Sequence, residues 1–371
     1  MKKSANNHTQ QEPGTTGLFF ALIRCGIGKE EKLPVSPTAT QWAVLFEMAR
    51  KQTLAGIAFA GIEKLPNEQR PPKHILLQWY SLCESIKSKN AELNRKSSLV
   101  SQKFKDEGFD NCILKGQGIA QLYPNPALRT PGDIDIWLAG GSKCILQYVR
   151  KFTPNEKPVY HHIDFPIAPG LDIEVHFTPS WMYSPFKNRK LQQFFSKNAA
   201  QQFSNIIKAG EYSIPAPTPA FNRIYILLHI YRHLFFEGIG IRQLLDYYFV
   251  IKQETTEDEK IEHIRLLKEF GLYKFATAAT YAMQQMFMLE DEFTYITPNK
   301  KEGEFLIHEI MTAGNFGQYD TRYKSTQRGL NLARFYDFIK RSAILITHYH
   351  FETLWNPYFK TWHTLWRWRN R

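Results

Sequence analysis

Residues 129–138 read Arg-Thr-Pro-Gly-Asp-Ile-Asp-Ile-Trp-Leu and contain the clearest strand pattern of the sequence. From Asp133 onward, polar and apolar side chains alternate, which is typical of a β-strand with one face on an apolar core. Asp133 and Asp135 are therefore expected to share one face of this strand. Two neighbouring carboxylates repel each other unless a cation or a cationic side chain lies beside them. An isolated Asp-x-Asp is common on solvated strands, so the pair needs support from the rest of the chain.

Strand patterns also occur on either side of this stretch. Residues 111–116 form a short apolar run that ends in Lys-Gly, as a strand that meets a turn would. Residues 159–167 and 171–177 alternate as well, and residues 168–170 between them read Ala-Pro-Gly, which is turn chemistry. We therefore expect the two alternating segments to form a β-hairpin.

The second strand of this hairpin supplies a third carboxylate. Asp172, Glu174 and His176 alternate with apolar residues and are expected on one face. If this strand lies beside the first, Glu174 converges with Asp133 and Asp135. Three carboxylates are hard oxygen ligands, which suit Mg²⁺ or Mn²⁺.

Helical periodicity dominates on both sides of the strands. Trp42, Leu45 and Ala49 recur at helix spacing, and the same period returns after Pro219 and lasts nearly to the end. Helices, then clustered strands, then helices predict an α+β fold. The expected parts are a flexible N-terminal segment, a helical N-terminal region, a catalytic core and a helical C-terminal region, at residues 1–37, 38–108, 109–214 and 215–371.

Composition restricts the partners and the compartment. The 371 residues carry a net charge of +12, which favours polyanions such as nucleoside triphosphates, nucleic acid or an anionic membrane surface. The 4 cysteines form no C-x-x-C pair, which argues against a zinc knuckle or a disulfide framework. The apolar run at residues 18–23 is too short for a secretory signal or a membrane span. We expect a cytoplasmic monomer without stable membrane insertion.

These pieces together resemble a known family. L-K-G-x-G at residues 114–118, L-R-x-x-G-D-I-D-I at 128–136 and D-I-E-V-H at 172–176 resemble the uncharacterised bacterial nucleotidyltransferase family of the DNA polymerase β-like superfamily. That superfamily is marked by a glycine-containing turn after a strand, then D-h-D-h, then a separate h-[DE]-h, where h is apolar. The resemblance extends upstream to residues 48–50 and downstream to residues 228–246. One departure is Gln117, which stands where the superfamily turn usually has Ser or Gly.

The resemblance implies a polymerase β-like core, a small mixed sheet with helices, flanked by helical regions. It implies transfer of a nucleoside monophosphate from an NTP, with ATP expected, to an unidentified small molecule, RNA or protein, with release of pyrophosphate. Two Mg²⁺ or Mn²⁺ ions would assist. The residues that would carry this chemistry are the catalytic metal ligands Asp133, Asp135 and Glu174, and the nucleotide-binding residues Lys115, Gly116, Gln117 and Arg129. For Lys115 and Arg129, the alternative is an ion pair with the aspartates.

Further polar residues are expected around the site. They are His162, Asp164, His176, His229, His233, Arg242 and Asp246. His229, His233 and Glu237 follow one helix face, but Ile230 replaces the glutamate of H-E-x-x-H, so no zinc-protease site is expected there. The alternative for this stripe is a buried, hydrogen-bonded interface.

Three further alternatives stay open. Near the C-terminus, tryptophans interleave with basic residues, which indicates either a base-stacking or membrane surface or an amphipathic helix docked on the body. The whole chain could be a non-catalytic nucleotide- or RNA-binding protein that uses its positive charge. A D-x-D glycosyltransferase would need a parallel α/β run ahead of the motif, where residues 38–108 have a helical pattern instead.

Overall fold

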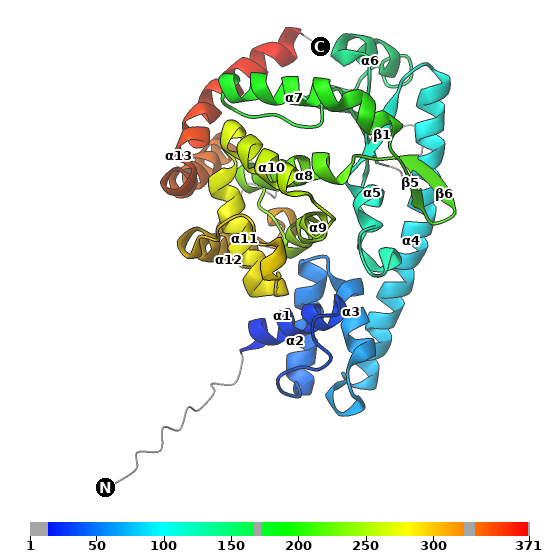
Figure 1. The fold of residues 1–371 in the computed structure, drawn as a ribbon, viewed down its shortest axis with the longest axis vertical. Coiled ribbons are helices and arrows are strands. Elements are labelled where there is room, and N and C mark those ends of the chain that lie inside the picture. Colours follow the sequence, from blue (N-terminus) through cyan, green and yellow to red (C-terminus); the bar gives the residue numbers. More distant parts are fainter. Residues whose placement is uncertain (1–13, 167–171, 323–330, 370–371) are drawn as a thin grey trace.

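The computed structural model describes residues 14–166, 172–322 and 331–369. The fold is α+β and mostly helical, with a small mixed sheet beside a helical body (Figure 1). This confirms the predicted fold class. Within the described ranges, no helix combines the length and the apolar character that crossing a bilayer requires.

The N-terminal helices lie at the end of the molecule opposite the C-terminus (Figure 1). They are α1 (Thr15–Gly26), α2 (Ala39–Lys51) and α3 (Ala55–Lys64), followed by the long α4 (Lys73–Asp106). Thr38 caps α2, since its hydroxyl accepts from the Gln41 amide at 3.2 Å while the Gln41 side chain accepts from the Thr38 amide at 2.8 Å. The 34-residue α4 connects these helices to the sheet along one side (Figure 1).

Helix α1 corrects the predicted flexible segment at residues 1–37. Residues 1–13 lie outside the described ranges, but Thr15–Gly26 is a helix whose apolar side chains are buried in the core. The apolar run at residues 18–23 is too short for a membrane but long enough to cover one side of a helix. Gly26 permits its close approach to α3, because a Cβ there would lie 2.1 Å from the Ile57 carbonyl oxygen.

The central sheet has four strands in the order β1-β2-β4-β3. They are β1 (Asn111–Leu114), β2 (Ile134–Leu138), β3 (His162–Asp164) and β4 (Ile173–His176). Strand β2 pairs with β1 antiparallel and with β4 parallel. The parallel register sets Asp135 directly opposite Glu174.

The predicted hairpin is confirmed in its pairing, because β3 and β4 are antiparallel. Its strands are shorter than the sequence pattern suggested. The turn expected at residues 168–170 lies outside the described ranges.

The two faces of β2 belong to different apolar clusters. Ile134 and Ile136 pack into a cluster with α4 and with α6 (Gly141–Val149). Trp137 points to the other face, where it stacks on Phe221 at 5.9 Å between ring centroids. Because side chains alternate along a strand, Asp135 lies on the Trp137 face, toward the helical body.

The remaining helices cover that face and build the body. They are α5 (Gly116–Ala120), α7 (Pro185–Ser204), α8 (Pro219–Phe236), α9 (Ile241–Ile251), α10 (Glu257–Phe270), α11 (Tyr273–Phe287), α12 (Lys300–Ala313) and α13 (Asn331–Arg369). In the sequence, α7 is followed by a two-stranded ribbon, β5 (Ile206–Ala209) with β6 (Tyr212–Pro215), and then by α8. Single 3₁₀ turns occur at Asn67–Gln69, Pro126–Leu128, Asp291–Phe293 and Asn315–Gly317.

Helix α13 returns toward the sheet end of the molecule along α7 (Figure 1). It bends at Tyr349, whose φ of −128° and ψ of 49° are not helical, and it contains Pro357. A buried ion pair between Arg232 of α8 and Glu352 anchors it to the body. Helices α2–α4 and α8–α13 match the predicted helical stretches; their division into separate domains stays a prediction.

Candidate active site

Asp135 is the most deeply buried carboxylate of the predicted set. Asp135 is only 1% exposed. Its Oδ1 lies 3.0 Å from the Lys115 ammonium and 2.9 Å from Nε2 of His176. Its Oδ2 is buried without a hydrogen-bond partner. A buried carboxylate oxygen that lacks a donor is unfavourable, so this atom is available to a further cation.

Lys115 lies at the turn between β1 and α5. Its φ of +37° is a left-handed conformation, which is strained in a residue other than glycine, and Gly116 follows with a φ of +44°. Burial opposes the charge of Lys115, but Asp133 and Asp135 outweigh it and raise the pKa of the ammonium. The turn thus holds a fixed positive charge beside the two aspartates, and the ion pair with Asp135 matches the alternative given for Lys115 above.

Glu174 meets two histidines. Its Oε2 lies 3.3 Å from Nδ1 of His162 and 3.3 Å from Nε2 of His176. Burial raises the pKa of Glu174, but the hydrogen bond from His176 and the nearby positive charges lower it below its usual value. For His176, burial opposes the charged form, while hydrogen bonds to Asp135 and Glu174 raise the pKa to about 9. His176 therefore joins the two carboxylates as an imidazolium.

Two further histidines stand beside His176. The rings of His161 and His162 are 4.2 Å apart, and they lie 5.3 and 5.2 Å from the His176 ring. Burial and the charge of His176 lower the pKa of His162 to about 4. Burial and His162 lower the pKa of His161 well below its usual value. Both rings are neutral at pH 7, which leaves their nitrogen lone pairs available.

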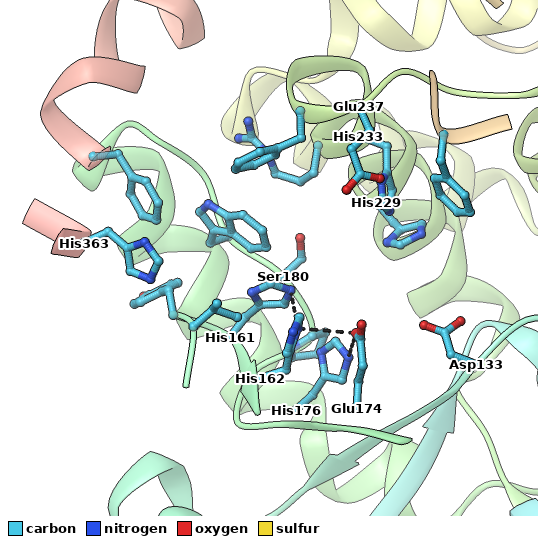
Figure 2. A pocket seen from close by; sticks show the side chains of 18 of the residues that line it. Asp133, His161, His162, Glu174, His176, Ser180, His229, His233, Glu237 and His363 are labelled. Carbon is cyan, nitrogen blue, oxygen red and sulfur yellow. Dashed lines mark hydrogen bonds and ion pairs between the residues drawn. The ribbon is translucent and has the colours of Figure 1, made fainter. Parts of the chain in front are cut away.

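Lys115, Asp133, His161, His162, Glu174 and His176 form one side, the floor, of a cavity of about 950 Å³, whereas the buried Asp135 does not line it. Figure 2 shows His161, His162, His176 and Glu174 together, with Asp133 across from the Glu174 carboxylate. His229, His233 and Glu237 line another wall, formed by α8 and the residue after it (Figure 2). This predicted polar stripe therefore faces the cavity.

Helix α13 supplies a third wall that the sequence did not assign to the site. Phe359, Lys360, His363 and Arg367 line the cavity from this helix. Aromatic side chains connect it to the sheet end, since Phe359 stacks on Trp181 at 6.1 Å and Trp181 lies 4.0 Å from the His161 ring. The interleaved aromatic and basic residues near the C-terminus were the only signal for this wall.

The residues fit a divalent cation. Asp135, Glu174 and His176 each offer a ligand atom within 4.8 Å of the others, and so do His162, Asp164 and Glu174. Asp133 lines the same cavity but belongs to no such group of three within the described ranges. Carboxylate oxygens, with one orphaned at Asp135, are the donors that hard divalent ions take.

Arg129 lies elsewhere. It is 3% exposed and makes a bidentate pair with Asp246, with Nε to Oδ1 at 2.7 Å and Nη2 to Oδ2 at 2.8 Å. Arg242 donates to the Thr130 carbonyl. None of Arg129, Arg242 and Asp246 lines the cavity, so contact between Arg129 and a phosphate would require breaking a buried ion pair.

The turn residue Gln117 is also directed away from the cavity. It is 4% exposed and donates to the Asn94 side chain and the Asn90 carbonyl of α4. Its side chain thereby fixes the turn against α4. Lys115 is the side chain of this turn that reaches the cavity.

One comparison with known proteins identifies the family of this chain. No curated protein matches the sequence. Among solved structures, an antigenic nucleotidyltransferase-like protein from Paracoccidioides brasiliensis is similar over 48% of this chain and 88% of its own, at 12% identity and a TM-score of 0.30. The family model described as "Uncharacterised nucleotidyltransferase" matches residues 38–288, well over half of the sequence, and includes the whole four-stranded sheet. The chain therefore belongs to this family of uncharacterised nucleotidyltransferases.

Proposed function

We propose that the protein transfers a nucleoside monophosphate from an NTP, with ATP as the expected donor, to an acceptor whose identity is open. The observation that carries this proposal is the parallel pairing of β2 with β4, which sets Asp135 beside Glu174. Glu174 lines a cavity together with Asp133 and Lys115, and the Lys115 ammonium pairs with the buried Asp135. Family membership supports nucleotidyl transfer as the type of reaction.

Asp133, Asp135 and Glu174 are the residues that would hold Mg²⁺ or Mn²⁺. When bound, such ions neutralise phosphate charge and lower the pKa of an acceptor hydroxyl. Asp133 forms neither a hydrogen bond nor an ion pair with another described side chain, so its carboxylate is free for this task. His176 orients Asp135 and Glu174 through its two contacts.

Lys115 is the candidate phosphate-binding side chain. Its ammonium reaches the cavity, stays charged, and already pairs with a carboxylate there. In the proposed reaction, the acceptor oxygen forms a bond to the α-phosphorus as the bond to the pyrophosphate oxygen breaks, and the acceptor proton is released. The negative charge on the leaving pyrophosphate is what a fixed cation stabilises.

The size and walls of the cavity support a second substrate. Drug-sized ligands occupy pockets of roughly 300–1,000 Å³, and this cavity, at about 950 Å³, lies at the upper end of that range. The carboxylate floor and the basic residues of α13 lie on different walls, so a nucleotide that spans these two walls leaves the α8 wall for an acceptor. We expect the acceptor to enter along α8.

The test uses ATP labelled at either the α- or the γ-phosphate, with Mg²⁺ and a cell extract as the source of acceptor. We expect label from the α-position alone in the product. Asp133→Asn and Asp135→Asn should lower the rate by at least about a hundredfold, because each removes charge that stabilises the transition state. Lys300→Ala, at an exposed side chain of α12 that does not line the cavity, is the control and should retain the wild-type rate.

Two outcomes would contradict the proposal. Transfer of the γ-label would show a phosphotransferase instead. RNA binding with a steep salt dependence, unchanged by loss of all three carboxylates and without transfer, would show the non-catalytic alternative. The glycosyltransferase alternative lacks its structural requirement, because α2, α3 and α4 precede the sheet.

A further inference from the structure

Three histidines crowd one side of the cavity, where β3 and β4 begin and end. His162 and His176 are direct partners in the antiparallel register, and His161 precedes β3 by one residue. One ring nitrogen from each lies within 4.8 Å of the others. Their ring centroids form a triangle with sides of 4.2, 5.2 and 5.3 Å.

We propose that His161, His162 and His176 bind a divalent transition-metal ion, with Zn²⁺ as the best fit. Only a neutral imidazole is a ligand, so His176 releases one proton to solvent as the ion binds. Imidazole nitrogen is a borderline ligand that suits zinc, copper, nickel and iron, whereas Mg²⁺ prefers oxygen. Three histidines with an open fourth position form a common catalytic zinc arrangement. Zinc–nitrogen bonds of about 2.0–2.1 Å require the nitrogens to lie about 3.4 Å apart, and the three nitrogens already lie within 4.8 Å of one another.

The surroundings hold the three rings in place. The His161 carbonyl accepts from the Phe177 amide at 2.8 Å, and the His161 ring packs on Trp181. Nε2 of His161 and Nδ1 of His162 lie 2.9 Å apart, so at least one of these nitrogens carries a lone pair. Nδ1 of His161 and Nδ1 of His176 are buried without a hydrogen-bond partner. Crowded imidazoles with unsatisfied nitrogens are disfavoured in a purely structural role.

A nearby carboxylate can complete the set of metal ligands. Glu174 lies 3.3 Å from both His162 and His176, where it can supply a fourth ligand or orient the imidazoles. Asp133 is outside every group of three described metal-ligating residues. The histidine site therefore differs from the proposed magnesium site in ligand chemistry and in its independence of Asp133, although Glu174 is near both and His176 contacts two of the magnesium ligands.

The experiment measures Zn²⁺ binding to the purified full chain after EDTA treatment, by calorimetry in millimolar Mg²⁺. Absorption of bound Co²⁺ gives an independent reading of nitrogen ligation. We expect one ion per chain that excess Mg²⁺ does not displace. His161→Ala and His162→Gln should each weaken binding by at least about tenfold, since each removes one ligand.

His233→Ala is the matched control, because His233 lines the same cavity outside the histidine triangle, and it should leave zinc affinity unchanged. Circular dichroism establishes that each variant is folded; if His161→Ala is not, His162→Gln decides. Equal zinc affinity in the wild type and in the folded variant, or displacement of zinc by Mg²⁺, would overturn the proposal.

Asp133→Ala separates this proposal from the proposed function. It should abolish nucleotidyl transfer while zinc affinity stays within about twofold of the wild type. If zinc binding follows the histidines and no nucleotide is transferred, the metal site stands and the proposed function fails. If nucleotide is transferred but zinc affinity does not depend on the histidines, the proposed function stands and the metal site fails.

Discussion

The contacts of His176 make stability depend on pH. Burial opposes its charge, but hydrogen bonds to Asp135 and Glu174 raise its pKa from 6.5 to about 9. Because the folded pKa is the higher one, the stabilisation is complete below about pH 6.5 and is lost as pH rises through 9. In EDTA-treated protein we expect the free energy of unfolding to fall by on the order of 3 kcal/mol as pH rises through this range. Urea unfolding measures this change. His176→Gln should remove this dependence, and an unchanged pH profile in that variant would contradict the assignment.

Substitutions in the Arg129–Asp246 ion pair distinguish a structural role of Arg129 from a phosphate-binding role. Arg129→Met leaves a buried carboxylate without its partner, which typically costs about 3–5 kcal/mol. We expect this destabilisation in thermal unfolding, with the KM for ATP unchanged in the folded fraction. Asp246→Asn should behave similarly, and the double variant should lose less than the sum of the two. A raised KM with unchanged stability would instead assign Arg129 to the nucleotide.

At the scale of elements, strand alternation was enough to predict β2, β4 and the β3–β4 pairing. It could not predict that β4 inserts between β2 and β3, because the order of strands depends on packing far along the chain. It could not separate Lys115 from Arg129, since both are basic residues near the aspartates in sequence. Only Asp246, on distant α9, decides that Arg129 points away from the cavity.

Helix α13 was predicted as part of the helical C-terminal region, and a helix docked on the body was one of two alternatives for its aromatic and basic residues. The structure makes it a wall of the cavity because Arg232 and Glu352 fix it to α8. We expect the double variant Lys360→Ala/Arg367→Ala to weaken Mg-ATP binding by about tenfold, with a smaller dependence on salt, since two cationic groups are lost. Calorimetry at two salt concentrations measures this. The control Lys300→Ala/Lys301→Ala removes the same number of positive charges from exposed residues that do not line the cavity, so it should have little effect. Equal losses in the two double variants would indicate only a net-charge effect.

At the scale of the whole molecule, the cavity lies where two apolar clusters meet. Ile134 and Val175 of the sheet belong to one cluster, while α8 and the later helices belong to the other. The cavity is lined from both the sheet end and the helical body. A substrate that contacts all its walls must therefore link the two clusters energetically.

Because a bound substrate links the two clusters, we expect its binding to slow amide hydrogen exchange in both of them. A ligand at 100 times its Kd stabilises the protein by about 2.7 kcal/mol, which slows exchange through open states by up to about a hundredfold. With Mg-ATP, we expect slower hydrogen exchange in residues 172–177 of the sheet end and 358–368 of α13 together. Residues 15–26 of α1, at the other end of the molecule (Figure 1), should be unchanged. Asp133→Asn should abolish both protected regions at once, because the carboxylate floor orients the triphosphate. Protection of one wall alone would mean that the nucleotide does not span the cavity and that α13 serves another ligand.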